Sequence, residues 1–169
     1  MNFRLAVLSD LIQLKQTYAE IIQHMNNNQI PIWDDIYPCE FFEEDIKQNR
    51  LYLLTKHTEI IAAFALCSSH SGERHVNWEN PDSKALYLDR LGVNACYMGT
   101  GIGSQMLEKA KETAKALGAD YLRLFAVDIN TPAIRLYQKN GFWQADGFYD
   151  EVIDDEFVLH EYGYEICLT

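Results

Sequence analysis

The chain has 169 residues, of which 48% are hydrophobic and 12% aromatic, and this composition predicts a single globular domain over residues 1–169. Its formal net charge of −11 argues against nucleic acid as a partner, because phosphate contacts need clustered Lys and Arg. The same charge favours cationic ligands, although a charge that only keeps the protein in solution is the alternative. No apolar run approaches the ~20 residues that span a bilayer, so no membrane association is expected.

The cysteines and histidines show no pattern that is typical of a metal site or a redox motif. No two cysteines form a C-x-x-C pair, and no two histidines lie four residues apart. We therefore expect no metal, and free thiols in a reducing cytoplasm at Cys39, Cys67, Cys96 and Cys167.

The N-terminal part of the chain predicts a strand, two helices and a hairpin. Apolar residues recur at helical spacing behind an N-cap at Ser9, and acidic residues open a second helix after Pro38. The apolar run before Ser68 predicts a strand that is covered on both faces. The expected ranges are 3–7 for the first strand, 9–25 and 40–49 for the helices, and 51–55 and 59–67 for the hairpin.

Two irregular connections are candidates for substrate contact. The segment from Ile30 to Pro38 places the aromatic side chains of Trp33 and Tyr37 beside the carboxylate of Asp34. Such a set suits an amine with an apolar body, although a loop that only covers the core is the alternative. The long connection over residues 68–84 has no periodicity and is expected to border the same cleft.

A strand, a glycine-rich loop and a helix follow in the middle of the chain. Residues 85–93 are rich in apolar residues and favour a strand, and the apolar residues from Ile102 to Leu117 lie on one helical face. The three glycines of the loop are Gly99, Gly101 and Gly103. Free N–H groups in the first turn of a helix, together with the helix dipole, create a site for an anion such as a phosphate.

The spacing of these glycines narrows the choice of ligand. A nucleotide-hydrolase loop needs Gly-Lys-Ser/Thr, and no lysine stands at Ile102 or Gly103. A dinucleotide fingerprint needs Gly-x-Gly-x-x-Gly in the first strand–helix unit, which disfavours an NAD-dependent oxidoreductase.

The loop instead resembles the acyl-CoA-binding loop of the GCN5-related N-acetyltransferase (GNAT) family, Gln/Arg-x-x-Gly-x-Gly/Ala. Gly101 and Gly103 match, whereas Met98 replaces the usual Gln or Arg and Ala95 stands where proline is frequent. The change at Met98 removes a polar contact to CoA, but a cradle of backbone amides does not depend on it. The resemblance implies that the CoA diphosphate is bound by Met98, Gly99, Thr100, Gly101, Ile102, Gly103 and Ser104.

The C-terminal part carries a second signature of that family. We expect a strand over 121–127, a helix from Asn130-Thr131-Pro132 to Asn140-Gly141, and two strands over 142–148 and 157–168 joined by an acidic loop over 150–156. The pattern Asn130-x-x-Ala133-x-x-x-Tyr137-x-x-x-Gly141-Phe142 matches the family at each position. The resemblance therefore runs from Leu86 to Phe142.

The resemblance implies an α/β fold, with a mixed, mostly antiparallel sheet of six to seven strands and helices on both faces. It implies direct transfer of an acetyl group from acetyl-CoA to an amine, with Tyr137 as the acid that protonates the CoA thiolate. Asn130 and Ala133 belong to the same motif, Asn130 either binding CoA or fixing the helix start. Backbone N–H groups of Leu91, Gly92 and Val93 would bind the thioester carbonyl.

Asp89 is the candidate base or ammonium anchor, because the run Leu86-Tyr87-Leu88-Asp89 resembles the polyamine-acetylating branch. Tyr87 lies on the same strand face and is the alternative, and a partner for a nearby cation is the purely structural interpretation of Asp89. The predicted acceptor is a small cationic primary amine, either a polyamine or an amino sugar. Its binding residues would be Trp33, Asp34, Tyr37 and Asp89.

Other functions stay open at this point. A protein N-terminal or lysine acetyltransferase is the rival within the enzymes, and a CoA-binding regulator without turnover is the alternative outside them. The resemblance also makes a homodimer one expected assembly.

Overall fold

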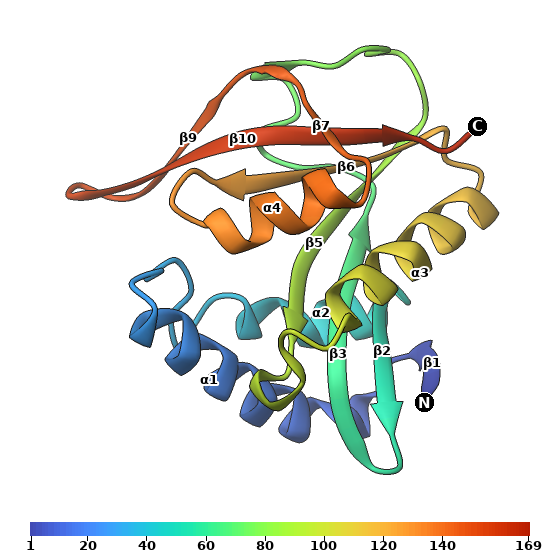
Figure 1. The fold of residues 1–169 in the computed structure, drawn as a ribbon, viewed down its shortest axis with the longest axis vertical. Coiled ribbons are helices and arrows are strands. Elements are labelled where there is room, and N and C mark those ends of the chain that lie inside the picture. Colours follow the sequence, from blue (N-terminus) through green and yellow to red (C-terminus); the bar gives the residue numbers. More distant parts are fainter. The chain divides into compact units, whose positions relative to one another are not determined.

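The computed structural model describes all 169 residues, which form two compact units (Figure 1). The first unit contains Met1–Leu66 and Arg90–Met106, and the second contains Cys67–Asp89 and Leu107–Thr169. The boundaries fall at the end of strand β3 (Glu59–Cys67), within strand β5 (Ala85–Val93) and within helix α3 (Ile102–Ala116).

The sheet of the first unit begins with β1 (Asn2–Leu5) and β2 (Leu51–Lys56), which pair antiparallel. Strand β2 also pairs antiparallel with β3, which confirms the predicted hairpin, and β3 is hydrogen-bonded to β5 on its other side. Each residue of β3 after Glu59 is buried, as expected for a strand that is covered on both faces.

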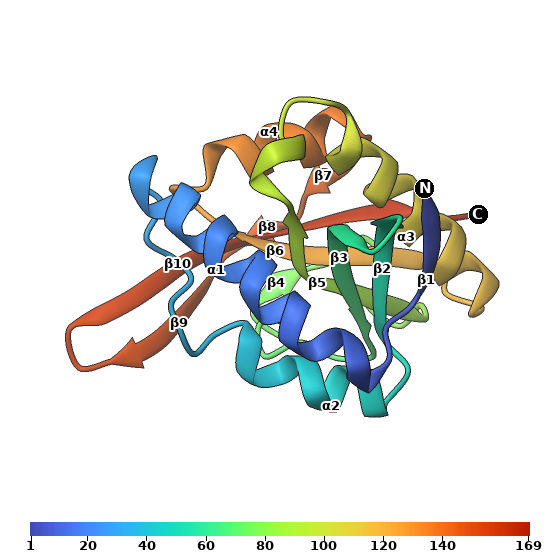
Figure 2. The ribbon, with the colours of Figure 1, turned by 90° about the horizontal axis from the view of Figure 1, so that it is seen from below.

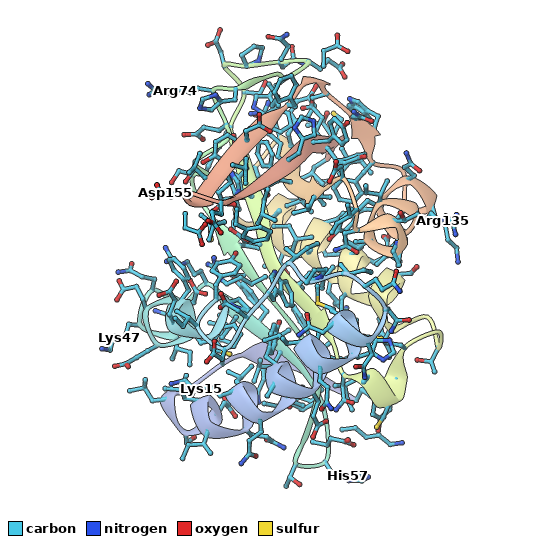
Figure 3. The ribbon with its side chains drawn as sticks, turned by 90° about the vertical axis from the view of Figure 1, so that its left-hand side faces the viewer. Lys15, Lys47, His57, Arg74, Arg135 and Asp155 are labelled. Carbon is cyan, nitrogen blue, oxygen red and sulfur yellow. The ribbon has the colours of Figure 1, made fainter.

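Helices α1 (Leu11–Asn27) and α2 (Phe42–Lys47) belong to the same unit (Figure 2). Helix α1 starts two residues later than predicted, because residues 8–10 form a 3₁₀ turn. Its apolar stripe is buried, while Lys15 on α1 and Lys47 on α2 are exposed (Figure 3). Helix α2 is shorter than its predicted range because residues 39–41 form a separate 3₁₀ turn.

Tyr18 connects α1 to the sheet of the first unit. The side chain is fully buried, and its hydroxyl donates to the carbonyl oxygens of Arg90 at 2.6 Å and Ala63 at 3.3 Å. The ring lies directly against Gly92, where an added Cβ would come within 2.8 Å of Cζ and of the hydroxyl oxygen of Tyr18. Gly92 is therefore required for this close approach of helix to strand.

Replacement of Gly92 by alanine is expected to destabilise the protein by about 1–3 kcal/mol, the usual cost of forcing extra atoms into a packed core. The Tyr18 ring is held by its two hydrogen bonds and has little freedom to move aside. Urea unfolding of the variant measures the loss, and an unchanged midpoint would show that the ring yields without cost.

A buried ion-pair network lies next to Tyr18 in the first unit. Asp45 of α2 is 0% exposed and accepts hydrogen bonds from Arg90 Nε and from a terminal guanidinium nitrogen of Arg90, both at 2.8 Å. It also accepts one from Arg50 Nε at 2.7 Å. Arg90 has a φ of 55°, in the left-handed region that non-glycine residues seldom adopt, so the network holds a bend in β5.

The sheet of the second unit contains the other part of β5. Residues Ala85–Tyr87 pair in parallel with β6 (Tyr121–Val127), and β6 pairs antiparallel with β10 (Phe157–Cys167). Strand β10 also pairs antiparallel with β7 (Trp143–Gln144) and β9 (Tyr149–Asp154). A separate short pair joins β4 (Val76–Asn77) to β8 (Asp146–Gly147). One parallel pair among antiparallel ones confirms the predicted mixed sheet and the α/β class.

One face of the second sheet is covered by the connection that contains β4. The Trp78 ring of this connection lies 5.6 Å from the Phe125 ring and packs against Gly163, where a Cβ would come within 2.8 Å of the indole. The Arg123 guanidinium lies 4.7 Å from the Trp78 ring centre and forms a buried ion pair with Glu165. The connection is therefore packed onto the sheet, although its sequence has no periodicity.

The prediction of an acidic loop over residues 150–156 is wrong. Most of that segment is strand β9, and only the turn at Asp155 and Glu156 separates it from β10. Asp155 is labelled in Figure 3. Acidic residues flank Val152 and Ile153 on both sides, so backbone pairing with β10 outweighs the low strand propensity of Asp and Glu. No helix in the structure is both long enough and apolar enough to cross a membrane.

Candidate functional site

The glycine-rich loop of the first unit lies between β5 and α3. Asn94 follows β5, and its side-chain oxygen accepts a hydrogen bond from the Cys96 N–H at 3.0 Å, which starts a short 3₁₀ turn. Gly99 and Gly101 then have φ values of 74° and 86°, and an added Cβ at either position would meet nothing within 4 Å. This part of the backbone is consequently exposed and free of side-chain cover.

Helix α3 begins directly after that turn. The Gln105 N–H donates to the Gly101 oxygen at 3.0 Å, which is the first hydrogen bond of the helix. The preceding amides, from Ile102 onward, have no carbonyl of the same helix to bind. Backbone amides at the positive end of the helix dipole, next to the exposed Gly99 and Gly101, form an arrangement that can hold a diphosphate.

Met98 and Thr100 are exposed beside the two glycines. The hydroxyl of Thr100 donates to the Tyr97 oxygen and thereby helps to fix the loop. Gly103 and Ser104 lie in the first turn of α3 and are partly buried.

The bend at Arg90 comes directly before the predicted oxyanion donors. Leu91 and Val93 are partly buried and Gly92 is buried. A residue in the left-handed conformation, such as Arg90, changes the direction of the strand that follows it. A β-bulge has the same effect. The bend lies where the family resemblance places the donors.

The second unit contains Tyr137 on helix α4 (Thr131–Lys139). The helix starts at Asn130, whose side-chain oxygen accepts from the Ala133 N–H at 3.4 Å. Asn130 therefore fixes the start of the helix, which is one of its two predicted functions. The Tyr137 ring packs 6.1 Å from Phe142, and burial of its hydroxyl, followed by the nearby Asp89 charge, raises the pKa of Tyr137. The hydroxyl thus stays protonated throughout the neutral range.

Tyr87 and Asp89 lie on one face of β5 in the second unit. Tyr87 is 3% exposed, and its ring lies 6.2 Å from the rings of His70 and Trp78. Burial raises the pKa of Tyr87, and Arg123 lowers it by a smaller amount. The parallel pairing with β6 ends at Tyr87, so Asp89 lies beyond it and is partly buried.

The three predicted substrate residues of the first unit already make contacts inside the protein. Trp33 stacks on Tyr18 with ring centres 5.7 Å apart. Asp34 accepts hydrogen bonds from the N–H groups of Ile36 at 2.8 Å and Tyr37 at 2.7 Å, so its carboxylate shapes the turn. The Tyr37 ring packs edge-on against Phe41 at 5.5 Å. Their contact with an amine stays a prediction.

One acidic residue that the sequence did not single out is Glu161 of β10. It is 7% exposed, and its Oε2 has no hydrogen-bond partner. Burial, then a hydrogen bond with Glu151 and the charge of that residue, then the charge of Asp89, raise the pKa of the Glu161 carboxyl well above its usual range. In the sequence, Glu161 is a charged residue at an inward position of a strand with alternating residues. That position can be recognised as buried only when both faces of the strand are known to be covered. No group of three or more His, Cys, Asp or Glu side chains in the chain is arranged to hold a metal ion.

Comparisons with known proteins agree with this geometry. The model of the acetyltransferase (GNAT) family matches residues 16–142. The thialysine N-epsilon-acetyltransferase of Bos taurus is 30% identical over 49% of this chain and 51% of its own length. The mycothiol acetyltransferase of Corynebacterium glutamicum is 29% identical over 44% of this chain and 25% of its own. The chain thus spans about half of the length of the first of these curated relatives and about a quarter of the second.

Solved structures show the same fold over nearly the whole chain. A GNAT-family acetyltransferase from Streptococcus agalactiae has a TM-score of 0.81 at 16% identity, over 98% of this chain and 94% of its own. A Salmonella typhimurium structure that contains the cofactor acetyl-CoA has a TM-score of 0.67 at 15% identity, over 99% of this chain and 94% of its own. Since the family model covers most of the chain and both family motifs are present, this protein belongs to the GNAT acetyltransferase family.

Proposed function

We propose that the protein transfers an acetyl group from acetyl-CoA to a primary amine, and that the acceptor is a small cationic amine such as a polyamine or an amino sugar. The observation that carries the proposal is the exposed glycine turn before α3, in a chain that belongs to the GNAT family. The net charge of −11 supports a cationic acceptor, as does the relative named for acetylating an ε-nitrogen of thialysine.

In the proposed reaction the backbone from Met98 to Ser104 binds the CoA diphosphate. Backbone N–H groups of Leu91, Gly92 and Val93 donate to the thioester oxygen as negative charge develops on it. The neutral amine nitrogen attacks the carbonyl carbon, the C–S bond breaks, and the sulfur takes a proton from the Tyr137 hydroxyl. The excess proton of the amine passes to Asp89, directly or through water, with Tyr87 as the alternative acceptor.

Asp89→Asn is expected to lower kcat/KM for the amine by about 10²-fold, the lower range for loss of a positioned base. The amide cannot take a proton, so the pH–rate profile should also lose its dependence on this group. Rates across a pH series measure both effects. A profile identical to that of the wild type would exclude Asp89 as the base, and the same series on Tyr87→Phe would then test the alternative.

A turnover screen tests the function itself. Released CoA is measured with acetyl-CoA and a panel containing polyamines, amino sugars, lysine peptides and peptides with free N-termini. Turnover confined to small amines supports the proposal, whereas turnover confined to peptides supports a protein acetyltransferase. CoA binding without turnover of any amine would favour a regulator.

We also propose that the protein is cytoplasmic, which is consistent with four cysteines that form no disulfide. We further propose that it forms a homodimer.

A further inference from the structure

The hydroxyl of Tyr18 lies at the bend in β5. It donates to the Arg90 carbonyl oxygen at 2.6 Å, and the Ala63 oxygen of β3 lies 3.3 Å away. A Cβ added to Gly92 would come within 2.8 Å of the same hydroxyl oxygen, so this oxygen also lies against the second residue after the bend. The hydroxyl is therefore in contact with the β5 backbone on both sides of Leu91.

A hydroxyl can bind two backbone groups at once, because it both donates and accepts hydrogen bonds. Its hydrogen points to the Arg90 carbonyl, which is the nearer of the two carbonyls. Burial raises the pKa of Tyr18, whereas the Arg90 charge and a hydrogen bond from the Gly92 backbone N–H lower it. The hydroxyl oxygen thus accepts from Gly92 while its hydrogen is donated to Arg90.

The bond to the Arg90 carbonyl also sets the direction of the next amide. The peptide between Arg90 and Leu91 is trans, since the cis bond of the chain is Tyr37–Pro38. In a planar trans peptide the C=O and N–H groups point in opposite directions. When Tyr18 holds the Arg90 oxygen, the Leu91 N–H is consequently directed away from Tyr18.

The amides that follow alternate between the two edges of β5. The Asn94 N–H donates to a carbonyl oxygen of β3 at 2.8 Å, and Gly92, two residues earlier, directs its N–H to the same edge. The N–H groups of Leu91 and Val93 point to the other edge, which faces β6 in the strand order. The pairing with β6 ends at Tyr87, so a ligand can take the place of a strand at these two amides.

The Tyr18 ring is itself held in place. Phe42 of α2 meets it edge-on with ring centres 4.7 Å apart, and Trp33 stacks on it at 5.7 Å. Tyr18 is 0% exposed, so its hydroxyl is out of reach of a substrate. The hydroxyl can act on a reaction only through the backbone that it holds.

We propose that Tyr18 is a positioning residue for the oxyanion donors, and that these donors are the N–H groups of Leu91 and Val93, because Tyr18 occupies the N–H of Gly92. The role of Tyr18 rests on the proposed function, in which amides of this stretch donate to the thioester oxygen. It narrows the three proposed donors to two.

Amide-resolved NMR of the wild-type protein tests which amides bind the thioester. Spectra with acetyl-CoA are compared with spectra with CoA, which has the same diphosphate but no thioester carbonyl. We expect the amide protons of Leu91 and Val93 to move downfield in the acetyl-CoA complex, and that of Gly92 to stay where it is. A downfield shift of Gly92 equal to theirs, or no shift of Leu91 and Val93, would overturn the proposal.

Tyr18→Phe tests the role of the hydroxyl, since the phenyl ring keeps the contacts with Trp33 and Phe42. The Gly92 amide should exchange with solvent at least about 10-fold faster in this variant, while the Asn94 amide, which is bound to β3, is unchanged. Removal of an oxyanion donor costs about 10²–10³-fold in kcat, and here the donors are only displaced, so we expect kcat to fall by about 10- to 100-fold. The dissociation constant of CoA should not change.

Infrared difference spectra with ¹³C-labelled acetyl-CoA give a readout that a residue with only a packing role would not move. Hydrogen bonds from the donors lower the stretching frequency of the thioester carbonyl, so this lowering should be smaller in Tyr18→Phe than in the wild type. Tyr52→Phe is the matched control, because it removes a hydroxyl from another ring of the same unit, one that stacks on Phe3. The carbonyl frequency should be the wild-type value in that control. The wild-type value in Tyr18→Phe as well would contradict the positioning role.

The outcomes separate the role of Tyr18 from the proposed function. A protein that acetylates no amine, yet shows the shifts of Leu91 and Val93 with acetyl-CoA, loses the proposed function and keeps the positioning role. A protein that acetylates amines at the same rate with and without the Tyr18 hydroxyl loses only the positioning role. If Tyr18→Phe does not fold, the wild-type NMR comparison still decides which amides are the donors.

Discussion

Tyr137→Phe is expected to lower kcat by about 10²-fold or more while the dissociation constant of acetyl-CoA stays nearly unchanged. A positioned acid contributes 10²–10⁴-fold to proton transfer, and the phenyl ring retains the packing of Tyr137 against Phe142. The raised pKa of Tyr137 keeps its hydroxyl protonated, so the wild type should lose no activity through its ionisation between pH 7 and pH 9. Steady-state rates and calorimetric titration of CoA measure the two quantities.

Tyr164→Phe is the matched control for that experiment. Its ring lies 6.4 Å from the Tyr137 ring, and the substitution removes one hydroxyl from the same aromatic cluster. We expect a much smaller change in kcat than for Tyr137→Phe. An unchanged kcat in Tyr137→Phe would remove Tyr137 from the chemistry and leave it a packing residue of α4.

Asp45→Ala is expected to cost about 3–5 kcal/mol of stability, the usual result of breaking a buried ion pair from one side. The substitution leaves the Arg90 guanidinium, which is 6% exposed, without its carboxylate, and it frees the left-handed bend that Asp45 holds. Unfolding in urea measures the loss. Because the bend precedes Leu91, Gly92 and Val93, the variant should also bind acetyl-CoA more weakly in conditions where it is still folded.

Glu43→Gln on the same helix is the control for this variant. Glu43 pairs with Lys47 at 2.8 Å, but both side chains are exposed and the pair is screened by water. We expect no resolvable change in the urea midpoint. A loss in Asp45→Ala no larger than in Glu43→Gln would mean that the buried network does not stabilise the fold.

The parts of the fold that the sequence predicted best are those set by local pattern. Residues 121–127 are almost all apolar and β-prone, and strand β6 has those limits. The helix after Asn130 was equally clear, because an N-cap and a proline in the first turn are local signals. The exposed turn at Gly99 and Gly101 likewise follows from glycine itself, since both φ values are positive.

The features that the sequence did not reveal depend on contacts between distant residues. Strand β9 is acidic and owes its form to pairing with β10. The sequence predicts Asp34 as a substrate residue but does not reveal that its carboxylate also binds the N–H groups of Ile36 and Tyr37. In the sequence, Glu161 occupies an ordinary polar position of an amphipathic strand. The alternation of residues along β10 does not show that the connection over residues 68–84 covers the face on which Glu161 lies.

The proposed reaction depends on the binding of the CoA diphosphate by the backbone amides at the start of α3. Calorimetric titration of the wild-type protein with CoA and with pantetheine, which lacks the diphosphate, tests it most directly. We expect saturable binding of CoA, a rise in melting temperature, and far weaker binding of pantetheine. No heat and no melting shift with CoA, or equal affinity for pantetheine, would contradict it.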